Sequence, residues 1–390
     1  MKNLPWKKLL YLVISWRLVL LLVSFLADSF LSYDPSFPYS SEILAKLNLA
    51  RWLYSWGNFD GVHYLTIAAK GYLGTGLIQA FFPVFPLILS FLKAIFGQYF
   101  FLMTLLLQFF TTYLLTGLFF YFVMVVLKKS TKVAWLTVSL LLAFPNSLFL
   151  AAVYNEGLFL CFILASFIFA KQRNWWLAGL LGALASATRV VGIAIWPALL
   201  IEWWQSKNLK LNRQNLVKEL KTNWCEVVAI SSSTLGLLAY MLYLNKFFHD
   251  PLYFFKVQSE FGAGRQEDLI LLPQVIWRYL KIFTTTPIDW KFYAYLQEFV
   301  FSLSAFAILL FNWKKIRLAY LLFALIVITV PTLTGTFSSM PRYIMVAWPI
   351  YYLLAEWINE NKAKKLSLLA LSLLLLIINT LLFIQGYWVA

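Results

Sequence analysis

Long apolar stretches recur along the whole sequence, and they limit the possible folds more than any other feature. Hydrophobic residues make up 62% of the 390 residues, whereas charged residues make up only 12%, about half the fraction that a soluble domain carries. An apolar run of about 18 residues or more can cross a lipid bilayer as a helix. The sequence therefore predicts an all-α polytopic membrane protein rather than a soluble domain with one buried core.

These stretches predict about eleven transmembrane helices, which we treat as a single integral membrane domain over residues 1–390. The predicted spans cover residues 9–27, 100–127, 133–150, 155–170, 175–188, 190–205, 224–244, 293–311, 317–336, 342–358 and 366–386. No small-residue cleavage site follows the first span, so we expect a retained helix and not a signal peptide. The spans at 175–188 and 190–205 are short and adjacent, so they could instead form one long broken helix.

The basic residues indicate how the spans are oriented. A net charge of +16 would suggest a nucleic-acid partner in a soluble protein. Here most basic residues cluster in short loops, as they do in cytoplasmic loops of membrane proteins. With the amino terminus inside, the inner segments carry Lys2, Lys7, Lys8, Lys128, Lys129, Lys132, Lys171, Arg173, Lys207, Lys210, Arg213, Lys218, Lys221, Lys314, Lys315, Arg317, Lys362, Lys364 and Lys365. We therefore expect no nucleic-acid partner, and two long outer segments at 28–99 and 245–292.

The first outer segment contains an apolar stretch that resists assignment as a span. Residues 81–96 are apolar, but Pro83 and Pro86 interrupt the start of the stretch. If it crossed the bilayer, every later basic loop would lie outside, against the positive-inside rule. We therefore expect an interfacial helix on the outer leaflet. The segment would then hold surface helices at about residues 42–55, 61–70 and 84–96.

Carboxylates are scarce, with 16 in the whole chain, so each one in an outer segment can be considered for chemistry. Asp60 precedes the helix-like stretch 61–70, which Gly71 closes. One interpretation is a helix N-cap, because aspartate is favoured there and glycine suits the residue after a helix. The other is a catalytic carboxylate, and both can hold, because a capping carboxylate can offer its second oxygen to a hydroxyl. His63 and Tyr64 follow one turn later on the same side.

The sequence gives little support for a metal or a cofactor. No D-x-D pair occurs, and the histidines are His63 and His249 alone. A tightly bound catalytic metal needs several oxygen or nitrogen ligands. We therefore expect a reaction without metal and without cofactor.

Further polar residues at the outer ends of predicted spans are candidates for binding an anion. Arg189 lies in an apolar setting, where an arginine needs an anionic partner. That partner could be a phosphate at headgroup level or, in a plain ion pair, Glu156. Arg342 begins the span 342–358 and could bind the same phosphate or be a snorkelling arginine. The topology brings these residues and Asp60 to one face of the membrane.

The motifs around these residues resemble those of a known family. The run W-x-x-F-D-G-V-H-Y-L-x-I-A-x-x-G-Y over 56–72, followed by A-F-F-P-x-F-P over 80–86, resembles the hallmark of the PIG-V family. That family comprises the second mannosyltransferase of GPI-anchor assembly and its prokaryotic relatives. Y-N-E-G-L-F over 154–159, A-T-R-V-V-G over 187–192 and P-R-Y over 341–343 resemble its later motifs, in the same order.

The resemblance implies the fold of the type C glycosyltransferases, with an active site on the outer side of the membrane. It implies that Asp60 is the catalytic base and that the donor is a polyprenyl-phosphate sugar, with mannose as the sugar. Arg189, Arg342 and His63 would bind the phosphate of that donor. The residues of the implied substrate site are His63, Tyr64, Tyr154, Glu156, Arg189, Arg342 and Tyr343. The acceptor would be a hydroxyl of a lipid or a glycan.

Two departures from the family pattern leave the acceptor open. Phe59 stands where the family has tryptophan, and Val190-Val191 stand where it has Ser-Asn. The compact chain favours a bacterial or archaeal plasma membrane, whereas a GPI enzyme would lie in the endoplasmic reticulum membrane. The related GPI enzyme works with a partner subunit, and the sequence leaves open whether this chain has an accessory subunit.

Two other functions compete with sugar transfer. A flippase or transporter for a lipid-linked glycan could use the same basic groove without bond chemistry. Transporters often contain paired repeats with broken helices at matching positions, and this sequence has no obvious repeats. A non-catalytic scaffold subunit is the third interpretation, and the clustering of polar residues argues against it.

Overall fold

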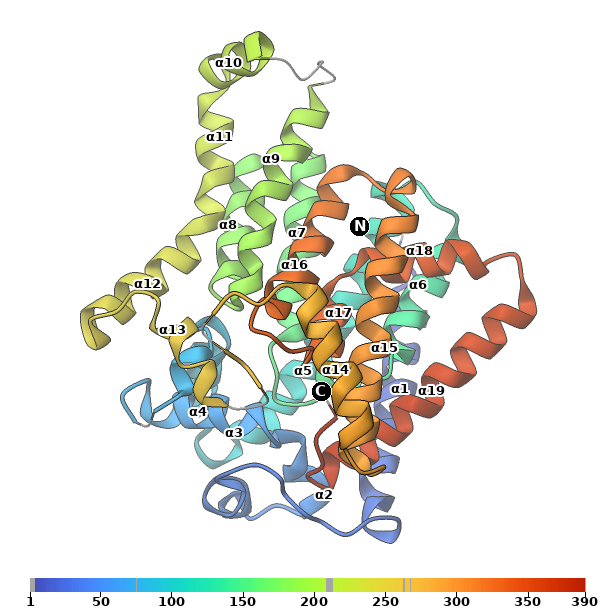
Figure 1. Ribbon diagram of the computed structural model, residues 1–390. Coiled ribbons are helices and arrows are strands. Elements are labelled where there is room, and N and C mark those ends of the chain that lie inside the picture. Colours follow the sequence, from blue (N-terminus) through green and yellow to red (C-terminus); the bar gives the residue numbers. More distant parts are fainter. Residues whose placement is uncertain (1–3, 75, 208–212, 262–263, 267, 390) are drawn as a thin grey trace.

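The computed structural model describes residues 4–74, 76–207, 213–261, 264–266 and 268–389. These residues form helices joined by turns, with no strand among them (Figure 1). The α-helices are α1 (Trp6–Leu26), α2 (Arg51–Tyr54), α3 (Asp60–Lys70), α4 (Val84–Phe96), α5 (Phe100–Tyr121), α6 (Thr131–Ala143), α7 (Glu156–Lys171), α8 (Trp175–Ser186), α9 (Ile195–Ser206), α10 (Arg213–Thr222), α11 (Trp224–Ser231), α12 (Leu235–Phe248), α13 (Tyr253–Lys256), α14 (Leu272–Thr285), α15 (Trp290–Phe311), α16 (Leu318–Thr332), α17 (Met340–Val346), α18 (Pro349–Ile358) and α19 (Lys362–Ile384).

Five helical segments in the described part of the chain are long and apolar enough to cross a membrane. They are Trp6–Ser29, Val84–Val126, Trp224–Phe248, Trp290–Phe311 and Lys362–Ile384. Shorter apolar helices lie at positions of further predicted spans: Thr131–Ala143, Trp175–Ser186, Val190–Ser206 and Leu318–Thr332. The all-α class is confirmed, with helix lengths typical of a membrane protein, and the number of about eleven spans stays a prediction.

The segment Val84–Val126 contains a turn and is not one straight helix. Gly97 has a φ of +54°, a conformation that glycine adopts without steric cost. The turn separates α4 from α5, and the two helices contact each other. With 13 residues, α4 is about 20 Å long, shorter than the hydrocarbon core of about 30 Å. This length is short for a transmembrane helix, as expected for an interfacial one.

The first outer segment matches its prediction in part. Helices α3 and α4 lie at the predicted positions, and α3 ends before Gly71, whose φ is +71°. The predicted helix over 42–55 is wrong. A π-turn (Ser40–Leu44) and a 3₁₀ turn (Ala45–Leu47) precede Asn48, whose φ of +52° lies in the left-handed region. A residue in that conformation cannot continue a right-handed helix, so α2 begins anew behind it.

Two predicted spans are interrupted next to prolines. The span over 133–150 ends at Ala143, two residues before Pro145. The span over 342–358 is broken between α17 and α18, which begins at Pro349. A proline lacks the backbone N–H that would bond to the preceding turn. It also disfavours the helical conformation in the residue before it, and Phe144, before Pro145, has a ψ of 136°. The second break lies at Ala347, whose ψ is 64°. Continuous helices over these two ranges were therefore a wrong prediction.

The adjacent spans at 175–188 and 190–205 form two helices and not one broken helix. Helix α8 ends at Ser186, and a 3₁₀ turn (Val190–Ala194) leads into α9. Between them Arg189 is extended, with φ −149° and ψ 144°. The turn therefore places the Arg189 side chain at the shared end of two helices.

The second outer segment, 245–292, contains α13 and α14, which hydropathy alone does not indicate. Helix α14 is amphipathic: Val275 and Tyr279 are buried, whereas Trp277 is 68% exposed. One face therefore packs on the protein, and the opposite face carries large apolar side chains outward.

Helices far apart in sequence pack together, since α1 contacts α19, α6 contacts α18 and α9 contacts α16. In Figure 1 the basic helix α10 lies at the top and residues 28–60 lie at the bottom. Helix α10 and residues 28–60 therefore lie at opposite ends of the molecule. Lys2 and Lys210, assigned above to the inner segments, fall outside the described residues.

Glycines allow α8 to approach the α11–α12 segment closely. A Cβ on Gly179 would overlap the carbonyl oxygen of Ala229, and a Cβ on Gly236 would overlap that of Ala183. Small residues at helix interfaces allow the backbones to approach closely, which is a common packing device in membranes.

We expect Gly179→Ala to lower the free energy of unfolding by about 1–3 kcal/mol, because the added methyl group forces the helices apart. Gly76→Ala is the matched control, since a Cβ at Gly76 meets no atom within 4 Å. Thermal unfolding of the purified protein in detergent measures both variants. Equal melting temperatures for the two would contradict the close helix contact.

Candidate active site

The chain turns sharply just before Asp60. Phe59 has a φ of +55° and a ψ of −118°, a strained backbone conformation for a residue with a Cβ. Its ring packs against Phe37, Phe383 and Trp388, with ring centroids 4.6, 5.7 and 5.5 Å apart. Asp60 is the first residue of α3, and among the described residues its carboxylate accepts a hydrogen bond only from Arg342. The N-cap prediction for Asp60 is therefore wrong, because Phe59 holds the cap position and the carboxylate points elsewhere.

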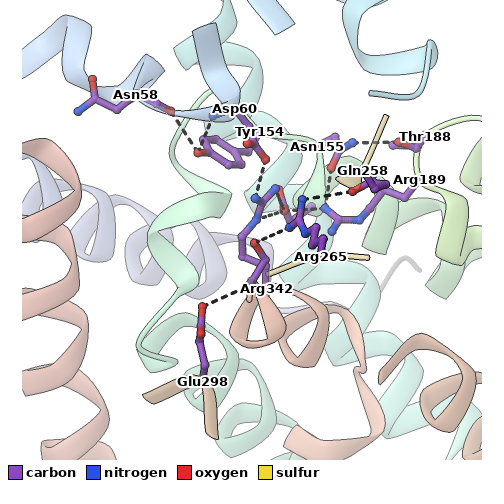
Figure 2. Close-up of polar contacts among 12 residues, drawn as sticks. Asn58, Asp60, Tyr154, Asn155, Thr188, Arg189, Gln258, Arg265, Glu298 and Arg342 are labelled. Atoms are coloured by element: carbon purple, nitrogen blue, oxygen red, sulfur yellow. Dashed lines mark hydrogen bonds and ion pairs between the residues drawn. The ribbon is translucent and has the colours of Figure 1, made fainter. Parts of the chain in front are cut away.

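Tyr154 fixes the start of α3. The backbone N–H of Asp60 donates to the Tyr154 hydroxyl oxygen at 3.2 Å, and that hydroxyl donates to the carbonyl of Asn58 at 3.1 Å (Figure 2). The Asn58 amide in turn donates to the carbonyl of Phe383 at 2.8 Å. Asp60 is thus anchored both to the segment before α7 and to the end of α19.

Arg342 joins two carboxylates in a buried ion network. Its Nη1 lies 2.5 Å from Oδ2 of Asp60. Its Nε and Nη2 lie 2.9 and 2.8 Å from Oε1 of Glu156, and Nη1 of Arg189 lies 2.6 Å from the same oxygen. The Glu156 side chain is 0% exposed and that of Arg342 is 7% exposed, whereas that of Asp60 is 22% exposed. The ion pair considered for Arg189 is therefore present, and the snorkelling interpretation of Arg342 is wrong.

Arg189 has further partners that fix its direction. Nη1 also donates to Oδ1 of Asn155 at 2.8 Å, and the Asn155 amide donates to the carbonyl of Thr188 at 2.9 Å (Figure 2). The guanidinium group lies over the ring of Tyr343, 5.1 Å from its centroid. A cation over an aromatic face is attracted by the ring quadrupole. Arg189 is therefore held in one orientation by several contacts.

The network keeps the Asp60 carboxylate ionised. Burial is the largest single effect and would raise the pKa of Asp60. The charges of Arg342, His63 and Arg265, together with the hydrogen bond from Arg342, outweigh it. The pKa of Asp60 is therefore below its ordinary value. Burial lowers the pKa of His63, and Asp60 opposes that effect only in part.

These side chains surround a cavity of about 490 Å³, a volume in the usual range of ligand-binding pockets. The predicted site residues that line it are Asp60, His63, Tyr64, Arg189, Arg342 and Tyr343. Tyr154 and Glu156 do not line it. They lie behind Asp60 and the two arginines, so in this structure they position other residues and have no surface in the cavity.

Aromatic and apolar side chains form much of the remaining wall. They are Phe37, Phe59, Phe81, Phe82, Val190, Val191, Tyr295 and Trp388. The ring of Phe81 stacks on His63 with centroids 5.0 Å apart. Charged groups and aromatic faces thus meet in one cavity, which suits a ligand with both an anionic and an apolar part.

The second outer segment supplies cavity residues that the sequence reasoning missed. Gln258, Arg265 and Lys291 line the cavity. Arg265 donates to Oε1 of Gln258 at 3.2 Å and to Oγ of Ser339 at 3.5 Å. The polar run around Arg265 was the available signal, but nothing in it indicates that Arg265 lines the same cavity as Asp60.

Among the described residues, no group of three or more histidine, cysteine, aspartate or glutamate side chains could hold a metal ion. The two carboxylates of the site, Asp60 and Glu156, are already paired with arginines. The donor set that the chain presents at the cavity is therefore suited to an anion and not to a metal cation.

No family model, curated protein or solved structure matches the chain. Its function is therefore inferred from the geometry of this site. The resemblance of its motifs to the PIG-V family stays a prediction.

We expect Glu156→Gln to lower the free energy of unfolding by about 3–5 kcal/mol, because it leaves two buried arginines with one carboxylate. Glu42→Gln is the matched control, since Glu42 is exposed and accepts a hydrogen bond only from Ser41 among the described residues. Thermal unfolding in detergent compares the two. Equal melting temperatures for both variants would show that the ion network does not stabilise the fold.

Proposed function

We propose that the protein is an inverting glycosyltransferase of the type C class, acting on a polyprenyl-phosphate sugar. It transfers the sugar, mannose according to the motif resemblance, to a hydroxyl of a lipid or glycan. The observation that carries the proposal is the Asp60 carboxylate, which is kept ionised by Arg342 and is partly exposed at a cavity rich in cations. Such an arrangement pairs a proton acceptor with groups that stabilise a departing anion.

The two oxygens of Asp60 have different surroundings. Oδ2 binds Arg342, whereas no described residue donates a hydrogen bond to Oδ1. In the proposed reaction the acceptor hydroxyl donates to Oδ1 while its oxygen attacks the anomeric carbon. The bond from that carbon to the phosphate oxygen breaks, its electron pair leaves with the phosphate, and the hydroxyl proton moves to Asp60.

A carboxylate with a lowered pKa is adequate for this step. The acceptor hydroxyl becomes acidic only as its oxygen bonds to the anomeric carbon, so the base has to accept the proton late in the reaction. A positioned base of this kind contributes about 10²–10⁴-fold to the rate. Arg342 would fix the direction of Oδ1 and keep Asp60 free of a proton beforehand.

The apolar helices agree with a donor that carries a long lipid chain. We propose that the cavity opens on the non-cytoplasmic side of a prokaryotic plasma membrane. The supporting observation is that α10, with its basic residues, lies at the end of the molecule opposite to residues 28–60 (Figure 1). Cytoplasmic loops are the ones enriched in lysine and arginine.

We expect Asp60→Asn to reduce sugar transfer by about 10²–10⁴-fold, because an amide cannot take the proton. Binding of the donor and the melting temperature should change little, since the amide oxygen can still accept from Arg342. Asp34→Asn is the matched control, because Asp34 is exposed in the same outer segment and does not line the cavity. Release of polyprenyl phosphate from the polyprenyl-phosphate sugar measures the rate.

Transfer by Asp60→Asn at the wild-type rate would remove Asp60 from the mechanism. Glycan transport across vesicles that is equal in the wild type and in Asp60→Asn, without any transfer, would favour the flippase function instead.

The lowered pKa of Asp60 predicts how the rate depends on pH. In the wild type the rate should persist as the pH falls toward about 4, where an ordinary aspartate takes up its proton. In Arg342→Gln the effect of burial dominates, the pKa of Asp60 rises, and the acid limb of the profile moves to higher pH. Arg342→Lys keeps the positive charge, so it should move the acid limb less than Arg342→Gln does. Identical acid limbs in the wild type and in Arg342→Gln would contradict the coupling.

A further inference from the structure

The cations of the cavity differ in whether a carboxylate neutralises them. Arg189 and Arg342 are paired with Glu156 and Asp60, so these four groups balance in charge. Arg265 and Lys291 also line the cavity, and no carboxylate oxygen of a described residue lies within the 4.0 Å ion-pair distance of either. The excess positive charge of the cavity therefore resides on Arg265 and Lys291.

We infer that Arg265 and Lys291 form a phosphate-binding subsite that is separate from the Arg189–Arg342 pair. The inference rests on the proposed function and assigns the lipid phosphate to the second outer segment. It differs from the expectation above, in which Arg189, Arg342 and His63 bind the phosphate. In our inference Arg189 and Arg342 do not bind the phosphate. They position the carboxylates of Glu156 and Asp60.

The cost of releasing each arginine from its present partners supports this division. Arg342 would have to leave two carboxylates inside the protein, and breaking a buried ion pair is strongly unfavourable. Arg265 is held only by neutral partners among the described residues, Gln258 and Ser339. It can therefore turn its guanidinium to a phosphate without leaving a buried charge unpaired.

The position of Arg265 also fits the reaction. Figure 2 shows it beside Arg189 and Arg342, and all three residues line the cavity. Its bond to Ser339 places it against the start of α17, the helix that carries Arg342. It is close enough to Asp60 to contribute to the lowering of that residue's pKa. A phosphate held by Arg265 would thus lie in the same cavity as the base.

The charges match the chemistry of the leaving group. A sugar linked through phosphate to a polyprenyl chain carries one negative charge. When the bond to the anomeric carbon breaks, the electron pair stays on the phosphate, which then carries close to two negative charges near pH 7. Two cations without carboxylate partners would stabilise the product phosphate more than the bound donor, and such differential binding accelerates the step.

The phosphate could belong to the donor or to a phospholipid acceptor, and binding experiments distinguish the two. The purified full chain in detergent is titrated with polyprenyl phosphate, with the polyprenol that lacks phosphate, and with phosphatidylglycerol. The variants are Arg265→Gln and Lys291→Gln. Lys281→Gln is the matched control, because Lys281 is an exposed lysine on α14, in the same outer segment, and does not line the cavity.

We expect Arg265→Gln and Lys291→Gln each to weaken binding of polyprenyl phosphate about 10-fold, the loss typical of one hydrogen bond to a charged group. Binding of the polyprenol and all binding by Lys281→Gln should stay at wild-type values. If binding of phosphatidylglycerol is weakened instead, the same subsite serves the acceptor phosphate.

The subsite is overturned if both variants bind both phosphate lipids as tightly as the wild type, or if Lys281→Gln loses as much affinity as they do. No sugar moves in this experiment, so its result is independent of the assay on Asp60→Asn. Loss of phosphate binding in the two variants, together with an absence of transfer in the wild type, would retain the subsite and reject only the enzyme.

Discussion

The contact on which the site depends is the bridge from Arg342 to Asp60 and Glu156. It joins three segments that are distant in sequence, since Arg342 lies 282 residues after Asp60 and 186 residues after Glu156. Glu156 is fully buried, whereas Asp60 is partly exposed at the cavity. One guanidinium group therefore links the interior of the helix assembly to the cavity. If Arg342 were removed, the buried carboxylate of Glu156 would keep only Arg189 as a positively charged partner. Asp60, the candidate base, would lose the positive charge that lowers its pKa.

Two strained residues direct the partners of this bridge. Phe59, with a φ of +55°, stands immediately before Asp60, and Ser339, with a φ of +64°, stands three residues before Arg342. The surroundings hold both: rings pack around Phe59, and the N–H of Ser339 donates to Glu298 at 3.2 Å (Figure 2). Backbone strain that is maintained by its surroundings is common at functional sites. Glu298 lies on α15. Through its bond to Ser339, α15 anchors the turn from which α17 begins.

The sequence was informative where the structure follows from local signals. The start of α4 behind Pro83 and the end of α3 at Gly71 were predictable, because proline and glycine act on their own neighbourhood. Topology alone also placed Asp60 and Arg342 on one face. The bridge between them was not predictable, since it depends on side-chain directions set by distant packing. Arg265 and Lys291 were missed for the same reason, because their positions in the second outer segment do not reveal which cavity they line. Asn48 and Ser339 adopt positive φ values, which no pattern of hydropathy indicates.

The account holds that an ionised aspartate and lipid-phosphate-binding cations share one cavity and together move a sugar. The most direct measurement is the mass of the lipid products after purified wild-type protein is incubated with polyprenyl-phosphate hexoses and a cell-envelope lipid extract. The account predicts an acceptor heavier by one hexose, together with an equal amount of free polyprenyl phosphate. If none of the polyprenyl-phosphate hexoses yields either product, the account is contradicted.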